Sequence, residues 1–210
     1  MTSTKTAVAL SPLPLATRTF PRLIQLFAGL VLYGTSMALM VRSQLGLNPW
    51  DVLHQGLAGH LGWSFGAVTA LTGVTVLLLW LPLRQRLGFG TAANVVVIAV
   101  AVDTALALVP PAPTLPWQLA LLAAGVVLNG LATATYVGAR LGPGPRDGLM
   151  TGLHVRTGRS IRVVRTGVEV VVLATGWLLG GTVGIGTAFY AVAIGPLTQF
   201  FLPFVTVRRS

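Results

Sequence analysis

The stretch Leu45-Gly46-Leu47-Asn48-Pro49-Trp50-Asp51 recurs 96 positions further on as Leu141-Gly142-Pro143-Gly144-Pro145-Arg146-Asp147. Both copies share the pattern L-G-x-x-P-x-D, and both continue as Leu-x-x-Gly-Leu. Glycine and proline interrupt regular structure, so their recurrence in one register is not a by-product of shared hydrophobicity. The repeat therefore predicts a fold organised around two copies of one irregular segment.

The composition is typical of a protein embedded in a lipid bilayer. Of the 210 residues, 54% are hydrophobic and 9% are charged, and the mean hydropathy is +0.81. Several apolar runs reach about 20 residues, which is enough for a helix to cross a hydrocarbon core of roughly 30 Å. The sequence therefore predicts an integral membrane protein whose principal partner is the lipid bilayer.

Charge and cysteine content argue against several other classes. The formal net charge is +10, but the basic residues lie in short segments between apolar runs, where they set membrane orientation. We therefore expect no nucleic-acid partner. The chain has no cysteine and three histidines, which argues against disulfides and against a metal site. No catalytic arrangement of residues stands out, so we expect neither an enzyme nor a bound cofactor.

The second half of the chain repeats the first without a gap. Apolar spans are predicted at about 23–41, 64–83 and 91–109, and the same pattern then restarts. We interpret the recurrence as an internal duplication. The recurring pairs outside the motif are Gly29 and Gly125, Leu32 and Leu128, Gly34 and Gly130, Gly56 and Gly152, Leu57 and Leu153, Gly62 and Gly158, Ser64 and Ser160, Gly88 and Gly184, Gly90 and Gly186, and Thr91 and Thr187.

The duplication divides the chain into five segments. Residues 1–21 are predicted to be a cytoplasmic N-terminal tail, and residues 206–210 a basic cytoplasmic tail. The first repeat spans 22–109 and the second spans 117–205. Residues 110–116 form a proline-rich external linker, because successive prolines cannot continue a helix.

The distribution of arginine predicts that the two repeats have opposite orientations in the membrane. Three crossings per repeat place Arg84 and Arg86 on the same side as both tails, with the linker on the other side. An odd number of crossings inverts the second copy, so its motif loop also falls on the arginine-rich side. The predicted fold is an all-α integral membrane protein with two inverted-topology repeats of three transmembrane helices, each containing a short re-entrant half-helix. Parallel repeats with four crossings each are the alternative.

This arrangement also predicts a location. Both termini are expected on the cytoplasmic side of a bacterial inner membrane, because cytoplasmic loops carry the excess of arginine and lysine. The arginines of the second motif loop that follow this rule are Arg140, Arg146, Arg156, Arg159 and Arg162.

The repeated motif predicts an extended entry followed by the first turn of a helix. Gly46 and Gly142 permit conformations that other residues resist, and Pro49 and Pro145 suit the first position of a helix. Asn48 is then the N-cap, with Gly144 in the same place in the second copy. Backbone of this kind occurs at membrane depth only inside protein or beside a wet cavity, and two helix N-termini there would attract an anionic or strongly polar group.

Polar residues near these two helix starts are the predicted binding site. The predicted site consists of the two motif aspartates, the residues that share a helix face with them, the N-cap asparagine and the motif arginine. Its members are Asn48, Asp51, His54, Gln55, Arg146, Asp147, Thr151 and His154. The alternative is that Asp51 and Asp147 only cap their helices and that the two histidines only make structural hydrogen bonds.

Three further charges lie inside predicted spans. Asp103 lies in the third span, and Arg165 precedes Glu169 by one helical turn in a later one. Ionisable groups in transmembrane segments usually mark a pathway or an internal pair, so these residues are predicted to couple transport to an ion or to stabilise helix packing. Gly176, Gly180 and Gly184 form a small-residue face that predicts close packing, either between the repeats or in a homodimer.

The motifs of the second half resemble those of the YczE family of bacterial integral membrane proteins, which is related to the YitT group. The resemblance rests on the second copy of the motif and on the residues that follow it. These are Arg165, Glu169, Gly180, Gly181, Gly184, Gly186, Thr187, Gly195 and Pro196. The resemblance implies a multi-spanning membrane protein and extends from about residue 22 to the end of the chain. It does not imply a substrate.

Inverted repeats, interrupted helices and intramembrane charges favour a small inner-membrane transporter or exporter. The predicted substrate is a polar or anionic small solute bound between the two half-helices, with alternating access. The alternative is a non-transporting membrane scaffold or accessory factor that assists a partner protein through its arginine-rich surface.

Overall fold

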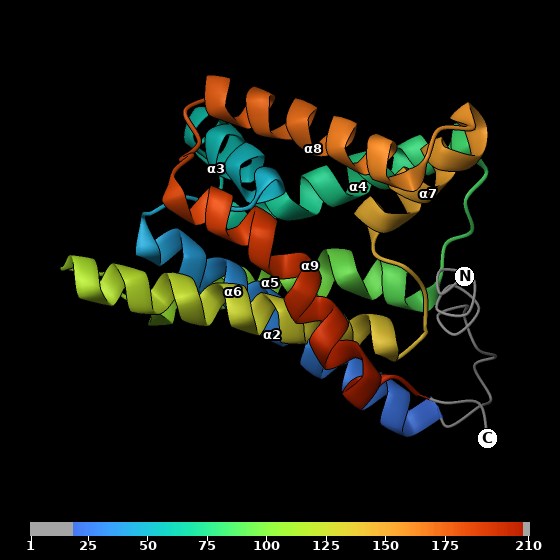
Figure 1. Ribbon diagram of the computed structural model, residues 1–210, viewed down its shortest axis with the longest axis horizontal. Helices are drawn as coiled ribbons and strands as arrows, with labels where there is room; N and C mark the ends of the chain where they lie inside the picture. The colour runs from blue at the N-terminus through green and yellow to red at the C-terminus, as the bar shows by residue number, and fades with distance from the viewer. Residues whose placement is uncertain (1–18, 208–210) are drawn as a thin grey trace.

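The computed structural model describes residues 19–207, and this part of the chain is entirely helical and loop, with no strand (Figure 1). Each of two short helices stands between long ones. The helices are α2 (Thr19–Ser43), α3 (Pro49–Leu61), α4 (Phe65–Leu83), α5 (Phe89–Leu108), α6 (Leu115–Gly138), α7 (Pro145–Thr157), α8 (Ile161–Leu178) and α9 (Ile185–Val205).

Five of the described helices are long and apolar enough to cross a membrane, namely α2, α4, α5, α6 and α9. The prediction of several helices long enough to span a membrane is confirmed. The sequence predicts six crossings, and the sixth long helix, α8, does not meet the same standard. Its 18 residues include Arg162, Arg165 and Glu169, which lower its hydropathy. Crossing by α8 requires shielding of these charges by protein or water.

Corresponding helices in the two halves begin at equivalent positions. Thr19 and Leu115, Pro49 and Pro145, Phe65 and Ile161, and Phe89 and Ile185 are each 96 positions apart. For the last three pairs the cause is local, because residues of the segments that precede these helices recur as well. Ser64 Oγ accepts a hydrogen bond from Ala67 N at 3.1 Å, and Ser160 Oγ accepts one from Val163 N at 3.4 Å. Gly88 and Gly184 precede the last helix of each half.

The helices form two layers, and each layer contains helices from both halves of the chain. One layer, which we call the scaffold layer, consists of α2, α5, α6 and α9, in which α2 packs on α5 and α6, and α6 packs on α9. The other, the short-helix layer, consists of α3, α4, α7 and α8, in which α3 packs on α8 and α4 packs on α7. Figure 1 shows the short-helix layer above the scaffold layer.

The two short helices lie at opposite ends of the bundle (Figure 1). At the α7 end, α2 begins and α6 and α9 finish: Arg22 Nε donates to Ala139 O at 2.9 Å, and Val207 N donates to Gly138 O at 3.1 Å. At the α3 end, α2 finishes and α9 begins, and Gly186 N donates to Leu45 O at 2.8 Å. The first described helix, α2, therefore begins at the same end of the bundle at which the last one, α9, ends.

Close packing within the short-helix layer depends on glycine. Gly176 of α8 lies against Leu53 of α3, and Gly148 of α7 lies against the indole of Trp80 of α4. Gly184 in turn lies against Leu45. Gly176 is buried in its contact with Leu53, whereas Gly180 and Gly184 are exposed. Packing between the repeats, one of the two roles predicted for this face, therefore holds for Gly176, and the homodimer stays a prediction.

The predicted tails lie mostly outside the described residues. Residues 1–18 and 208–210 are not described, whereas α2 already begins at Thr19 and Arg22 is fully buried. The linker is shorter than predicted, because α6 begins at Leu115 and includes Pro116 in its first turn. Proline is accepted there because the amides of the first turn have no helical acceptor.

Candidate functional site

The N-terminus of α3 is built by the first copy of the motif. Gly46 has a φ of 117°, and a Cβ there would lie 2.7 Å from Gly184 N, so no side chain fits. Asn48 Oδ1 accepts from Asp51 N at 3.0 Å, and Asn48 Nδ2 donates to Asp51 Oδ2 at 2.5 Å. Asn48 is therefore the N-cap, as the sequence predicts, and Asp51 holds its side chain.

The N-terminus of α7 has the same backbone and a different set of side chains. Gly142 has a φ of 135°, and Gly144 is the N-cap but supplies no side-chain hydrogen bond. Asp147 therefore has no neighbouring cap to bind, and its Oδ2 accepts from Tyr136 Oη of α6 at 3.2 Å. The two copies thus give one aspartate locked into its own helix and one turned toward another helix.

Each motif loop is held by the last helix of the other half. Gly186 N donates to Leu45 O at 2.8 Å, and Gly90 N donates to Leu141 O at 3.0 Å. Thr91 Oγ1 adds a bond to Pro143 O at 2.8 Å. Three carbonyl groups of the non-helical segments are thereby satisfied inside the protein.

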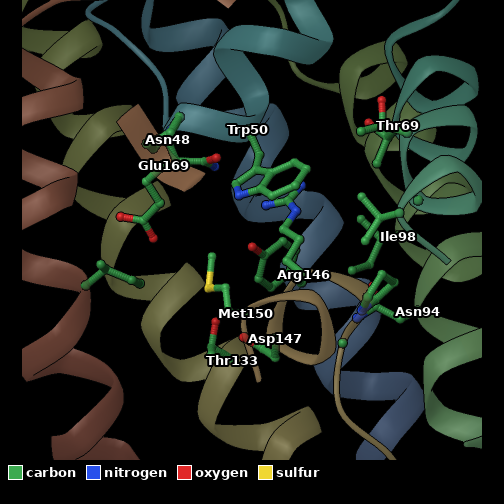
Figure 2. A pocket seen from close by; sticks show the side chains of 18 of the residues that line it. Asn48, Trp50, Thr69, Asn94, Ile98, Thr133, Arg146, Asp147, Met150 and Glu169 are labelled. Atoms are coloured by element: carbon green, nitrogen blue, oxygen red, sulfur yellow. The ribbon is translucent and has the colours of Figure 1, made fainter. Parts of the chain in front are cut away.

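A cavity of about 330 Å³ lies between the two layers, and the first turns of both short helices line it. Asn48 and Trp50 come from the α3 start, and Arg146 and Asp147 come from the α7 start. Figure 2 shows these four side chains around the cavity. The volume lies near the lower end of the range for pockets that hold small organic molecules, roughly 300–1,000 Å³.

Trp50 and Arg146 occupy the same motif position in the two copies, and they contact each other. The Arg146 guanidinium carbon lies 4.8 Å from the centroid of the Trp50 ring, a distance typical of a cation–π contact. Arg146 Nη2 also lies 3.9 Å from Asp51 Oδ1, which is beyond hydrogen-bond distance. The Trp50 indole N–H has no hydrogen-bond partner among residues 19–207.

Asp51 and His54 lie behind this contact and are fully buried. His54 Nδ1 is 3.3 Å from Asp51 Oδ1 and 3.2 Å from Thr69 Oγ1 of α4. His54 and Thr69 line the cavity, whereas Asp51 does not. The geometry of Asp51 therefore favours the capping role over direct contact with a ligand.

The charges predicted to lie inside the membrane separate into two groups. Arg165 and Glu169 of α8 form an ion pair at 2.9 Å and line the cavity. Asp103 of α5 does not line it: Asp103 accepts from Ser64 Oγ at 2.6 Å and from Gly66 N at 2.7 Å, at the start of α4. A carboxylate at a helix N-terminus stabilises that terminus, which is the structural alternative for Asp103.

Besides Asp51, which lies behind the cavity, three predicted site residues lie away from it. Gln55 Oε1 accepts from Thr182 N at 2.6 Å and so connects α3 to the loop before α9. Thr151 Oγ1 donates to Asp147 O at 2.9 Å within α7, and His154 Nδ1 lies 2.5 Å from Arg159 O. The structure therefore brings Asn48, His54, Arg146 and Asp147 together and leaves Gln55, Thr151 and His154 apart.

Several cavity residues were not predicted from the sequence. All three tyrosines of the chain, Tyr33, Tyr136 and Tyr190, line the cavity, as does Asn94. Tyr190 Oη donates to Asn129 Oδ1 at 3.1 Å. A sequence signal was available only for Tyr33, which lies in the middle of an apolar span and not at its end, where aromatic anchors are expected.

The chain is similar to known membrane-protein sequences over most of its length. The model of the family of unknown function DUF6198 matches residues 20–203. The chain belongs to this family. No solved structure is significantly similar to it.

Proteins similar to this chain occur in Haemophilus influenzae and Bacillus subtilis. An uncharacterized protein of Haemophilus influenzae is 42% identical over 85% of this chain and 82% of its own length. The uncharacterized membrane protein YczE of Bacillus subtilis is 34% identical over 84% of this chain and 83% of its own. The uncharacterized protein YyaS of the same organism is 28% identical over 84% and 90%. The resemblance to the YczE family is confirmed.

Proposed function

We propose that this DUF6198 protein is a small transporter or exporter of the bacterial inner membrane, built from two inverted repeats, with its substrate site in the cavity between the layers. The observation that carries the proposal is that one cavity is lined by the first turns of two short helices that lie at opposite ends of the bundle. Discontinuous helices whose N-termini meet at a central site are typical of transporters with inverted repeats. The proposed substrate is a polar or anionic small solute.

The two layers are the proposed moving bodies. The halves of the chain are interlocked, because α3 packs on α8 and α4 packs on α7 in one layer, while α2 packs on α6 in the other. Moving one half against the other would separate all of these contacts. Moving one layer against the other leaves them intact and changes only the contacts across the cavity.

The contacts across the cavity differ between the two halves of the chain, and this difference supports the proposed motion. In the first half, α4 packs along α5. In the second half, the corresponding helices α8 and α9 do not pack along each other. Val95 and Ala99 of α5 are buried, whereas the equivalent Ala191 and Gly195 of α9 are not. In a second state, α8 would pack along α9 and α4 would separate from α5. The cavity would then be closed on the α8–α9 side and open on the α4–α5 side, which gives alternating access.

The connections between the layers have the backbone that such a hinge needs. Residues with positive φ occur in all four connections: Gln44 and Gly46, Arg84, Arg140 and Gly142, and Gly180. Hinges are a few loop or terminal residues that absorb the change in φ and ψ. These connections are therefore the proposed hinges.

The inverted topology predicts opposite labelling of equivalent positions. Trp63 and Arg159 are 96 positions apart and exposed, one after α3 and one after α7. In intact cells a cysteine at Trp63→Cys should react with an impermeant thiol reagent, whereas a cysteine at Arg159→Cys should react only after permeabilisation. The parent chain has no cysteine and serves as the blank. Equal labelling of both positions from outside would falsify the inverted arrangement.

Loss of Arg146 should remove transport. The guanidinium is the one cationic group of the cavity without a hydrogen-bonded counter-charge among residues 19–207. We expect Arg146→Gln to lower uptake more than about tenfold, because an unpaired arginine in a low-dielectric site interacts strongly with an anionic group. The measurement is uptake of a panel of radiolabelled carboxylates, phosphates and amino acids into proteoliposomes.

The matched control for this variant is Arg162→Gln. Arg162 lies on α8, is exposed and does not line the cavity. It carries the same substitution and the same change of net charge. Equal transport by Arg146→Gln and by the parent chain, for a solute that the parent carries, would remove the cavity as the site.

The alternative function is a scaffold or accessory factor for a partner protein. It has one supporting observation, the exposed arginines Arg156, Arg159 and Arg162 at the α7 end of the bundle. If the alternative holds, no solute of the panel is carried, and replacing these arginines impairs the cell while Arg146→Gln does not.

A further inference from the structure

The charged groups that line the cavity are equal in number and opposite in sign. They are Arg146 and Arg165, and Asp147 and Glu169. Arg165 and Glu169 are joined at 2.9 Å and so neutralise each other. The groups left for a ligand are Arg146 and Asp147, which are neighbours in the first turn of α7.

Arg146 has unused donor capacity. Its closest carboxylate oxygen, on Asp51, is 3.9 Å away, and its other contact is with the face of the Trp50 ring. Trp50 is 6% exposed, lines the cavity and has an indole N–H without a partner among residues 19–207. A buried donor without a partner is costly, so this N–H is a place where a ligand acceptor is missing. A carboxylate would satisfy both the guanidinium and the indole.

Asp147 has unused acceptor capacity. Its side chain is exposed to the cavity, and its partners are the Tyr136 hydroxyl at 3.2 Å and the backbone of Gly144. A carboxylate has about four acceptor positions, so some of them remain open. An ammonium group would fill them, and the tyrosine rings nearby favour a cation as well.

Part of the rest of the wall is apolar, beside polar side chains such as Asn94, Thr133 and Gln199. Val76, Val95, Ile98, Met150 and Ile194 are buried residues that line the cavity. Figure 2 shows Met150 and Ile98 on opposite sides of Arg146. A ligand that is charged at one end and apolar at the other would therefore contact both parts of the wall.

We infer that the ligand of this cavity is a small zwitterion with an apolar side chain, of the α-amino acid class. Its carboxylate accepts from Arg146 and from the Trp50 N–H, and its ammonium group donates to Asp147. Neighbouring residues of one helical turn hold the opposite charges, which suits a ligand whose two charged groups are bonded to the same carbon atom. A simple anion would face the Asp147 carboxylate, and a simple cation would face Arg146, without compensation in a site of low dielectric.

The inference narrows the substrate of the proposed transporter, but it concerns binding and is tested without transport. The full chain in lipid nanodiscs is titrated calorimetrically with L-phenylalanine, with hydrocinnamate, which lacks the amino group, and with phenethylamine, which lacks the carboxylate. Leucine, isocaproate and isopentylamine form an equivalent aliphatic set. The zwitterion of at least one set should bind at least about tenfold more tightly than its two analogues, because an unpaired buried charge is left with each analogue.

Two variants should change the selectivity in opposite directions. Asp147→Asn should remove the preference for the zwitterion over the anion, so that hydrocinnamate binds as well as phenylalanine. Arg146→Gln should remove the preference for the zwitterion over the amine. Because each variant is expected to retain one ligand, a loss of all binding through misfolding is distinguishable from a change of selectivity. Arg162→Gln is the control that should keep the parent selectivity.

Three results would overturn the inference. One is equal binding of zwitterion and anion by the parent chain; a second is an unchanged preference in Asp147→Asn. The third is no binding by any member of either set. Transport of some other solute would then leave the proposed function standing. Conversely, zwitterion binding without transport would keep the inference and remove the proposed function.

Discussion

A disulfide between cysteines at Gly73→Cys and Val95→Cys is expected to stop transport reversibly. Gly73 is on α4 and Val95 is on α5, so the bond would tie the short-helix layer to the scaffold layer. A Cβ placed on Gly73 would lie 3.6 Å from the Val95 Cβ, within the range of about 3.5–4.5 Å that a disulfide requires. If the α4–α5 side must open once in each cycle, uptake should fall more than about tenfold on oxidation and return on reduction.

The parent chain makes this experiment clean, because it contains no cysteine. The two single variants, treated with the same oxidant, are the controls. Both positions line the cavity, so ligand binding must be measured on the oxidised protein as well. Intact binding with lost uptake indicates a locked protein, whereas loss of both indicates obstruction of the cavity.

One outcome would contradict the proposed opening of the α4–α5 side. Complete disulfide formation with uptake at the parent rate would show that the α4–α5 contact never opens. The layers would then not be the moving bodies. The equivalent positions Glu169 and Ala191 are expected to form a disulfide as a cysteine pair only when the α8–α9 side closes, so this pair reports the second state by crosslinking alone.

The second large effect is expected on stability, from Gly148→Ala in α7. The new methyl group would overlap the six-membered ring of Trp80, which is 1% exposed. Trp80 Nε1 donates to Pro145 O at 3.0 Å, so movement of the ring also breaks that bond. Overpacking costs about 1–3 kcal/mol and the bond about 1 kcal/mol, whereas the helix gains about 1 kcal/mol from alanine. We expect a net loss of about 2 kcal/mol, measured as a lower thermal midpoint in detergent.

Two further variants test whether the lower thermal midpoint comes from the clash with Trp80 or from the replacement of any helical glycine. A Cβ on Gly59 of α3 would meet nothing within 4 Å, so Gly59→Ala should leave the midpoint unchanged or raise it. Trp80→Phe removes the atoms that Gly148→Ala would strike. The double variant should therefore be less unstable than the sum of the two single effects by about 1 kcal/mol. Additive effects would show that the ring and the glycine are not in contact.

The same comparison explains how one duplicated sequence makes two different interfaces. Position 176 is equivalent to 80, and position 52 is equivalent to 148. In one interface the large residue is Trp80 on the long helix and the small one is Gly148 on the short helix. In the other, the small residue is Gly176 on the long helix and it lies against Val52 and Leu53 on the short helix. Equal backbone spacing is thus kept by opposite choices of side chain.

The sequence by itself determined the membrane class and the starts of the two short helices with their N-caps. These features depend on local causes, namely runs of apolar residues, N-cap residues and prolines, all of which are visible within one turn of the helix that they start. For this reason the start of α3 after Asn48 and the start of α7 after Gly144 were predictable, and the family resemblance in the motif was confirmed.

The tertiary structure alone decided which polar residues share a site. Gln55 and His54 are neighbours in sequence, yet one binds the loop before α9 and the other lines the cavity. Asp51 and Asp147 hold equivalent positions, yet Asn48 turns one inward and Gly144 leaves the other free for Tyr136. The physical reason is that a side chain hydrogen-bonds to the groups that helix packing places beside it, and these groups belong to helices distant in sequence. The repeated L-G-x-x-P-x-D motif therefore predicts two helix starts, while packing between the layers brings Trp50 and Arg146 together.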